Sequence, residues 1–216
     1  MANLFPQWVT PAARATLVSA MLLVVAIPAA FIGWVRTPRA RGEHLMIAQP
    51  VPFDHRIHAF ALRIDCRFCH TGVERSAWAG VPSTQQCVPC HSNVWLSSRE
   101  FAPVRLSLAT GRPIPWARVT QLPDFVYFNH AIHVRKGVGC ETCHGRVDRM
   151  GVVQQVVPLT MSWCVDCHRD PVPAIRPLDA VATMGWHRSD APGTSGTVLA
   201  ARYNVHRLTN CTTCHR

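Results

Sequence analysis

A long apolar stretch near the N-terminus is the strongest hydrophobic pattern in the chain. The residues between Arg14 and Arg36 are uncharged and mostly apolar. At about 1.5 Å per residue, a helix of this length crosses the hydrocarbon core of a bilayer. Trp8 and Trp34 stand near its ends, where interfacial aromatic residues are expected. We therefore predict one transmembrane helix over residues 13–36, kept as an uncleaved anchor.

The rest of the chain has a different pattern. Its apolar residues follow neither a sustained helical period nor a strand alternation, and the whole sequence contains 17 prolines and 12 glycines. The predicted fold is mainly α with little regular secondary structure: short helices bear the Cys-x-x-Cys-His and Phe-x-His-x-x-His stretches and are joined by loops.

An internal repeat organises this part of the sequence. The pattern Phe-x-His-x-x-His begins at Phe53 and again at Phe128, and the Cys and Val-Pro landmarks behind it recur after a similar interval. A near-constant spacing indicates a duplicated module. The predicted divisions are an N-terminal segment (1–12), the anchor (13–36), a linker (37–52), module 1 with an insert (53–127), module 2 (128–172) and a C-terminal segment (173–216).

All ten cysteines fall in Cys-x-x-Cys-His motifs. In such a motif the two thiols add to the vinyl groups of one porphyrin, and the histidine binds the iron. Zinc ribbons, redox dithiols and disulfides also use paired cysteines, but a histidine after every pair favours haem. We predict five haem c groups, held by Cys66, Cys69 and His70; Cys87, Cys90 and His91; Cys140, Cys143 and His144; Cys164, Cys167 and His168; and Cys211, Cys214 and His215.

Four further histidines are predicted to be distal ligands. A low-spin electron-transfer haem needs a second axial ligand. His55 and His58, like His130 and His133, have i, i+3 spacing, which places both side chains on one face of a helical turn. Each pair could therefore reach two neighbouring irons.

The fifth distal ligand is open between several residues. Met184 is the first choice, because thioether ligation would give one haem a higher potential than its bis-histidine neighbours. His206 and His187 are the alternatives, and His44 is the least favoured because it lies close to the predicted membrane segment.

No catalytic constellation is expected. A haem enzyme needs an open iron position and nearby acid or base groups, whereas this chain has enough ligands to close every iron. Glu74 and Asp148, which recur in the repeat, are expected to pair with Arg75, Arg149 or backbone donors.

The formal charge of +10 does not predict a nucleic-acid partner. Five haems would add about −10 when reduced or −5 when oxidised, because each carries two propionates. Lys136 is the only lysine. Since arginine pairs with carboxylates in a bidentate manner, propionate binding is a plausible use of the arginines, and a solvated surface is an equal alternative.

Orientation in the membrane is argued from the cofactor. Arg36, Arg39 and Arg41 follow the predicted helix and Arg14 precedes it, so the positive-inside rule alone would place the C-terminal part in the cytoplasm. Covalent haem attachment takes place outside the cytoplasmic membrane. We therefore predict a single-pass protein of the cytoplasmic (inner) membrane with its haem domain on the periplasmic side.

The motifs resemble those of known families. The stretches 53–91 and 128–171 resemble class III multihaem cytochromes, in which Phe-x-His-x-x-His supplies distal ligands. Together with the anchor, Ile64–His70, Leu122–His130 and Leu208–Arg216 are similar to the pentahaem subunits of bacterial alternative complex III. Met184 and Trp186 also resemble that family's pattern.

The resemblance implies a relay within a quinol:electron-acceptor oxidoreductase of a respiratory or photosynthetic chain. The partners would be an iron-sulfur protein, integral-membrane quinol-binding subunits, a monohaem cytochrome, membrane lipid, and a soluble cytochrome c or blue-copper acceptor. One alternative is a membrane-anchored quinol dehydrogenase that feeds periplasmic reductases. Another is a terminal reductase with a high-spin haem.

Overall fold

The computed structural model describes residues 5–215. The chain divides into two compact units, Met1–Glu43 and His44–Arg216. In the first unit, helix α1 (Val9–Val35) is long and apolar enough to cross a membrane, and none of its residues is buried. The predicted apolar helix is confirmed and begins four residues earlier than expected. Residues 1–4 of the predicted N-terminal segment, and Arg216, lie outside the described residues.

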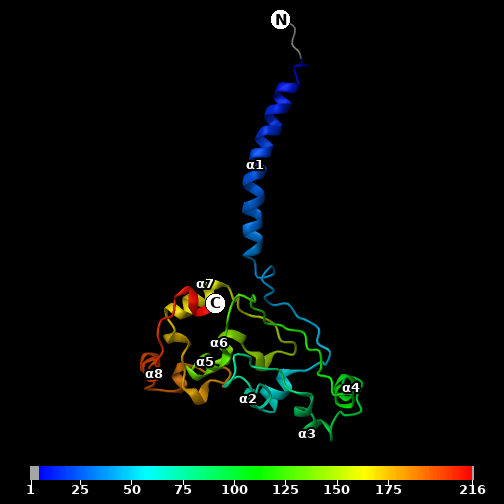
Figure 1. Cartoon of the computed structure of the whole chain (residues 1–216), viewed down its shortest axis with the longest axis vertical. Coiled ribbons are helices and arrows are strands. Elements are labelled where there is room, and N and C mark those ends of the chain that lie inside the picture. Colours follow the sequence, from blue (N-terminus) through cyan, green and yellow to red (C-terminus); the bar gives the residue numbers. More distant parts are fainter. Residues whose placement is uncertain (1–4, 216) are drawn as a thin grey trace. The chain divides into compact units, whose positions relative to one another are not determined.

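The second unit consists of short helices and irregular segments, as the sequence predicts (Figure 1). No β-strand occurs within residues 5–215, and the one isolated bridge joins Val138 to Ile175. The α-helices are α2 (Cys66–Cys69), α3 (Val88–His91), α4 (Ala102–Thr110), α5 (His130–Arg135), α6 (Cys140–His144), α7 (Met161–Arg169), α8 (Gly196–Arg202) and α9 (Cys211–Cys214). The other turns are a π-helix, η1 (Arg56–Ala61), and five 3₁₀ turns: η2 (Thr84–Gln86), η3 (Val147–Arg149), η4 (Val172–Ala174), η5 (Leu178–Ala180) and η6 (Arg188–Asp190).

Local capping residues decide where the histidine- and cysteine-bearing helices begin. The side chain of Asp65 accepts a hydrogen bond from the backbone at the start of α2, and Asn129 and Thr160 do the same for α5 and α7. Such caps satisfy backbone N–H groups that a helix leaves unpaired in its first turn. Each cap therefore fixes where the cysteine and histidine side chains that follow it are placed.

The apolar core of the second unit is small. Its buried apolar residues are Phe101, Val104, Ile114, Ala131, Ile175, Val181 and Leu199. Large apolar side chains near the cysteine motifs, such as Phe68, Trp78 and Tyr127, are exposed. A folded domain of this size ordinarily buries much more apolar surface. The polypeptide is thus suited to wrap around large apolar groups that complete its interior.

Candidate haem sites

Each Cys-x-x-Cys-His motif forms its own short helix. The motifs lie on α2, α3, α6, α7 and α9, and their cysteines at i and i+3 share one face of the turn. The ten thiols are free, and within residues 5–215 no three His, Cys, Asp or Glu side chains gather as a metal cluster. Each pair stands on its own helix, as separate porphyrin attachments require.

Three of the predicted distal histidines face a motif histidine across a gap of suitable width. A metal–imidazole bond of about 2 Å places the ring centroids of two imidazoles on opposite sides of one metal about 6 Å apart. The observed centroid separations are 6.2 Å for His58 and His91, 6.5 Å for His130 and His144, and 6.0 Å for His133 and His168. The geometry fits one iron between each pair.

The remaining distal histidine of the first repeat is close to His70. Burial, and then the charge of His70, lowers the pKa of His55 to about 4. Burial likewise lowers the pKa of His144 to about 4. A ligating imidazole must be neutral, so burial keeps these side chains in the form that binds metal. His55 Nδ1 is buried without a hydrogen-bond partner.

Backbone carbonyls fix the tautomer of most of these histidines. A carbonyl can only accept, so Nδ1 carries the proton and Nε2 is left free for a metal. The Nδ1–acceptor distances are 2.9 Å for His58 and Asp54, 2.8 Å for His70 and Gly80, 3.2 Å for His91 and Val94, 2.9 Å for His130 and Ala77, 2.7 Å for His133 and Asn129, 3.1 Å for His168 and Leu208, and 3.1 Å for His215 and Phe125.

The two Phe-x-His-x-x-His stretches have nearly the same geometry. In each, the phenylalanine meets the first histidine edge-on and stacks on the second. The stacked centroids are 4.3 Å apart for Phe53 and His58 and 4.4 Å apart for Phe128 and His133. The edge-on angles are 83° and 89°. This likeness supports the interpretation of the repeat as a duplicated module.

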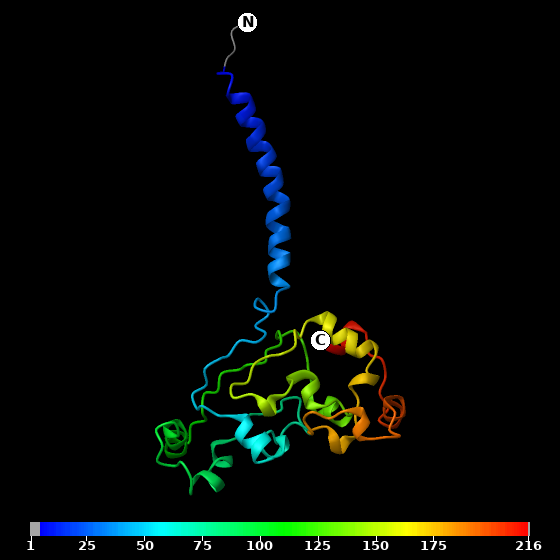
Figure 2. The ribbon, with the colours of Figure 1, turned by 180° about the vertical axis from the view of Figure 1, so that it is seen from behind.

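Electrostatic coupling between thiols indicates which motifs are neighbours. Cys140 lies within hydrogen-bonding reach of Cys66 and lowers the pKa of the Cys66 thiol. Burial raises the pKa values of Cys69, Cys143 and Cys164, and the charge of a cysteine from another motif adds to each shift: Cys87 for Cys69, Cys167 and Cys164 for Cys143, and Cys214 for Cys164. The motifs therefore follow one another in the order 2, 1, 3, 4, 5, which the helices α3, α2, α6, α7 and α9 trace in Figures 1 and 2.

A buried arginine beside motif 3 has donor capacity left over. Arg176 donates to Glu141 at 2.9 Å and to the carbonyl of Thr183 at 3.1 Å. Its Nε is buried without a hydrogen-bond partner. A buried N–H of this kind calls for an acceptor, and a haem propionate has the charge and the oxygens to serve. The side chains at this site could therefore bind a haem through its propionate as well as through its iron.

Met184, the predicted fifth distal ligand, lies beside motifs 1 and 3. The carbonyl of Val181 accepts from the backbone of Cys140 at 3.0 Å, and the Sγ of Cys66 lies 3.9 Å from the carbonyl of Ala182. The backbone N–H of Gly185 donates to Glu141. These contacts place the segment around Met184 against α2 and α6. The motif histidines of these two helices already face other histidines.

The two alternative histidines are exposed. His187 precedes η6, where its backbone N–H donates to Asp190, and His206 lies in the extended segment before α9. Among residues 5–215, no hydrogen bond or ring contact joins His187, His206 or Met184 to His215. His44 is also exposed.

The acidic residues of the repeat have other partners than expected. Glu74 pairs with Arg67, and the buried carboxylate of Asp148 pairs with Arg146 at 2.6 Å. The expectation of Arg75 and Arg149 as ion-pair partners is wrong. Arg146, two positions before Asp148, reaches the carboxylate better than the adjacent Arg149 because Arg146 lies across the turn.

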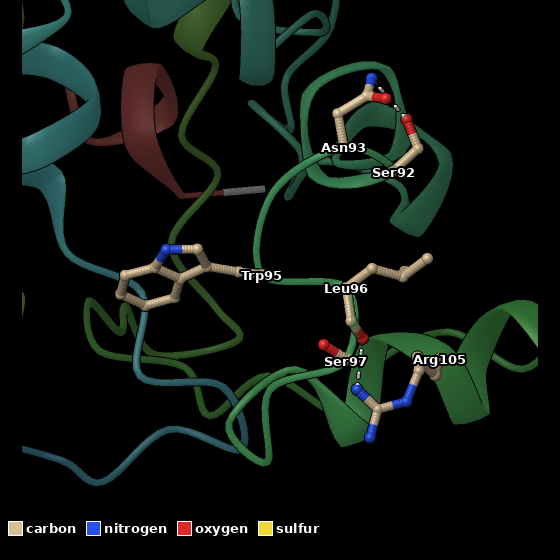
Figure 3. A pocket seen from close by; sticks show the side chains of 6 residues that line it. All are labelled: Ser92, Asn93, Trp95, Leu96, Ser97 and Arg105. Atoms are coloured by element: carbon tan, nitrogen blue, oxygen red, sulfur yellow. Dashed lines mark hydrogen bonds between the residues drawn. The ribbon is translucent and has the colours of Figure 1, made fainter.

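The insert after motif 2 has a role that sequence reasoning missed. Phe101, Val104 and Ile114 form a small core packed against Cys87, and Phe101 stacks on His91 with ring centroids 4.7 Å apart. Figure 3 shows residues that line a pocket in the insert, where the Arg105 guanidinium donates to the carbonyl of Leu96. The signal in the sequence was the clustering of bulky apolar residues in a segment without cysteine.

The cysteine-motif helices and the histidines that face them have the pattern of a multihaem cytochrome c, a class of protein whose cofactor is haem c. A family model for cytochrome c7 and related cytochrome c matches residues 126–216. Over 97 residues the chain is 37% identical to the menaquinone reductase multihaem cytochrome c subunit of Nitratidesulfovibrio vulgaris (strain Hildenborough). That match covers 44% of this chain and 45% of the relative. The matched region thus spans less than half of the relative.

Proposed function

We propose that this chain is a membrane-anchored pentahaem cytochrome c that relays electrons as a subunit of a quinol-linked complex of the alternative complex III type. The observation that carries the proposal is that one short helix presents two histidines to two different motifs: the ring centroids of His130 and His133 lie 6.5 Å and 6.0 Å from those of His144 and His168. A relay needs each site to adjoin the next. A storage or sensing protein with isolated haems does not.

Every motif histidine receives a place in this relay. The proposed axial pairs are His55 and His70 for haem 1, His58 and His91 for haem 2, His130 and His144 for haem 3, and His133 and His168 for haem 4, with His215 on haem 5. Each η1 or α5 turn would then hold ligands of two haems, which fixes those haems as neighbours. Haems 1 and 3 adjoin through Cys66 and Cys140, and this contact joins the two modules.

The protein's own contribution is to hold and shield these groups. When bound, haem c supplies reversible one-electron chemistry at its iron. The carbonyl bonds to Nδ1 keep each imidazole turned towards its metal, so little reorganisation accompanies electron transfer. With both axial positions filled by histidine, irons 1 to 4 have no position open to a small substrate. The arrangement therefore supports a relay and gives no place for reductase chemistry there.

The membrane setting is part of the proposal. Helix α1 would anchor the chain in the cytoplasmic membrane, with the haem unit on the periplasmic side. Electrons would come from an iron-sulfur subunit fed by quinol oxidation and leave to a cytochrome c or a blue-copper protein. A second candidate is the same relay run in reverse, towards membrane quinone. The name of the relative, a menaquinone reductase subunit, favours it.

The experiment is to isolate the complex from intact membranes with this chain tagged. The co-isolated subunits are identified, and haem reduction is followed after addition of a quinol analogue. We expect an iron-sulfur subunit and integral-membrane subunits, reduction of the haems by quinol, and only low-spin ferric iron in haems 1 to 4. Quinol reduction of the separated chain alone would show a quinol dehydrogenase and contradict the proposal. Haem reduction by a reduced carrier with transfer to quinone would establish the reverse direction instead.

A further inference from the structure

The loop that follows motif 2 exposes three apolar side chains in a row. Val94 is 53% exposed, Trp95 66% and Leu96 41%. Single exposed apolar residues are common on protein surfaces, but exposed apolar residues that adjoin one another mark interaction sites. We call these three residues the Trp95 patch.

The backbone of this loop is fixed in a conformation that displays the indole. Trp95 has a φ of 65°, in the left-handed region that bulky residues rarely adopt. The Ser98 N–H donates to the Trp95 carbonyl at 3.0 Å. The Arg105 guanidinium donates to the carbonyls of Leu96 and Ser98, and Figure 3 shows it on the opposite side of the loop from the Trp95 ring. Backbone strain of this kind persists where the surrounding structure enforces it, and it is concentrated at functional sites.

The patch is one hydrogen bond away from a predicted haem ligand. His91 Nδ1 donates to the carbonyl of Val94 at 3.2 Å, and Val94 is the covalent neighbour of Trp95. Cys90 of the same motif is exposed. Motif 2 also stands at one end of the motif order, and Figures 1 and 2 show α3 and α4 together at one end of the second unit. An electron that passes between motif 2 and the outside would therefore have the Trp95 patch beside its ligand.

The surroundings of the patch are basic. Residues 93–122 contain four arginines and one acidic residue, Glu100. Arg99 and Arg112 are exposed, and no ion pair within residues 5–215 takes up their charges. At 0.1 M salt such charges act over about 10 Å. They would attract a partner with a negatively charged face and speed its approach.

The small size of the Trp95 patch indicates a partner that binds transiently. Permanent subunit interfaces bury more than about 2,000 Å² and have an extended apolar centre, whereas weak redox encounters bury less than about 1,200 Å². Three adjacent apolar side chains beside exposed arginines match the second kind. Tryptophan and arginine are also the residues that most often dominate the energy of an interface.

We propose that the Trp95 patch docks a small soluble one-electron carrier with a negatively charged face, and that electrons leave the chain at haem 2. This inference rests on the proposed function, because it assumes a haem at motif 2. The indole would fill the centre of the contact, with Arg99 and Arg112 at its rim. In each encounter the haem 2 iron loses one electron and the metal of the carrier gains it. No bond is made or broken, and no proton is transferred.

The test uses the isolated membrane complex. Its haems are reduced with dithionite, the excess is removed, and the complex is mixed rapidly with an oxidised blue-copper protein of net negative charge. An oxidised cytochrome c of net positive charge serves as the comparison. We expect faster haem oxidation by the negatively charged carrier, with a second-order rate constant that falls about tenfold or more as salt is raised.

Four variants locate the effect on the surface. Trp95→Asn removes the ring and suits the left-handed backbone better than tryptophan does, and it should lower the rate constant about tenfold. Arg99→Glu should lower both the rate constant and its salt dependence. Val198→Ser and Arg202→Glu change exposed residues of α8, which lies at the other end of the second unit in Figures 1 and 2. These two controls should stay within about twofold of the parent.

The haem content, redox titration and subunit composition of Trp95→Asn should equal those of the parent. An unchanged rate constant in Trp95→Asn overturns the docking surface, as it would if lipid or a second copy of the chain covered the patch. Loss of a subunit from that variant also overturns it, because the patch would then belong to a permanent interface. So does an equal or faster reaction with the positively charged cytochrome.

The two arginine variants give an independent decision if Trp95→Asn does not assemble. Equal effects of Arg99→Glu and Arg202→Glu overturn the docking surface, because only the overall charge would then matter. All of these outcomes leave the relay intact. A parent chain that carries fewer than five haems contradicts the proposed function itself.

Discussion

The imidazole planes of His130 and His144 are nearly parallel, with 6° between them. The rings of His133 and His168, by contrast, cross at 63°. His130 and His133 belong to the same short helix, α5, so one turn presents two imidazoles to two different partners at different angles. We therefore expect the two proposed bis-histidine sites to differ electronically.

The first prediction concerns the spectra of these two sites. The orientation of axial ligands is a property by which a protein sets the electronic state of haem iron. We expect a rhombic low-spin signal from haem 3 and a strongly anisotropic signal with a large highest g value from haem 4 in paramagnetic resonance. His133→Ala should remove only the second signal and His130→Ala only the first. Loss of the same signal in both variants would contradict the pairing.

A second prediction concerns Phe101. This buried residue stacks on His91 from the insert. Phe101→Leu should destabilise the second unit by about 1–3 kcal/mol through loss of packing and should alter the signal of haem 2 alone. Leu106→Ala, on the exposed side of the same helix, is the matched control and should change stability by less than about 0.5 kcal/mol. Equal effects of the two changes would show that the Phe101 contact has no special role.

Gly139 offers a third prediction, before Cys140. A Cβ at this position would come within 2.2 Å of the Arg176 guanidinium. Arg176 is buried and bound to Glu141 and Thr183, so it has little room to withdraw. Gly139→Ala should cost about 1–3 kcal/mol by overpacking and lower haem attachment at motif 3. Denaturant unfolding and intact mass measure both effects. Gly33→Ala, where a Cβ meets nothing within 4 Å, should have no effect on the second unit.

The fourth prediction is a pH dependence at Asp148. The hydrogen bond from Arg146 holds the pKa of this carboxyl below its ordinary value of 3.8. Because the folded pKa lies below the unfolded one, the ion pair stabilises the fold fully above pH 3.8 and is lost as pH falls through the folded pKa. Asp148→Asn should cost about 1–3 kcal/mol at pH 7, and its difference from the parent should shrink below pH 3.8.

The control for this prediction is Asp166→Asn. Its ion pair with Arg169 is exposed on both sides, and exposed pairs contribute little. Unfolding free energies at pH 7 and near pH 3 give the comparison. A loss in Asp148→Asn that is the same at both pH values would contradict the role of its charge.

The sequence predicted the features that repeat or follow a fixed local spacing. The apolar helix and the helical motifs were of this kind, and so was the i, i+3 presentation of His130 and His133. The structure adds which histidine faces which motif, since that depends on how distant segments pack. The contact between Phe101 and His91 and the pairing of Asp148 with Arg146 could not be predicted for the same reason. Met184 was chosen from its sequence neighbours, which carry no information on where its segment lies.

The central claim is that each of the five Cys-x-x-Cys-His motifs holds a covalently attached haem. Intact mass spectrometry of the mature chain, with a quantitative haem assay on the same sample, tests it most directly. We expect a mass that exceeds that of the 24.0 kDa polypeptide by five haem c groups. A mass equal to that of the polypeptide alone, or one that accounts for fewer than five haems, would contradict it.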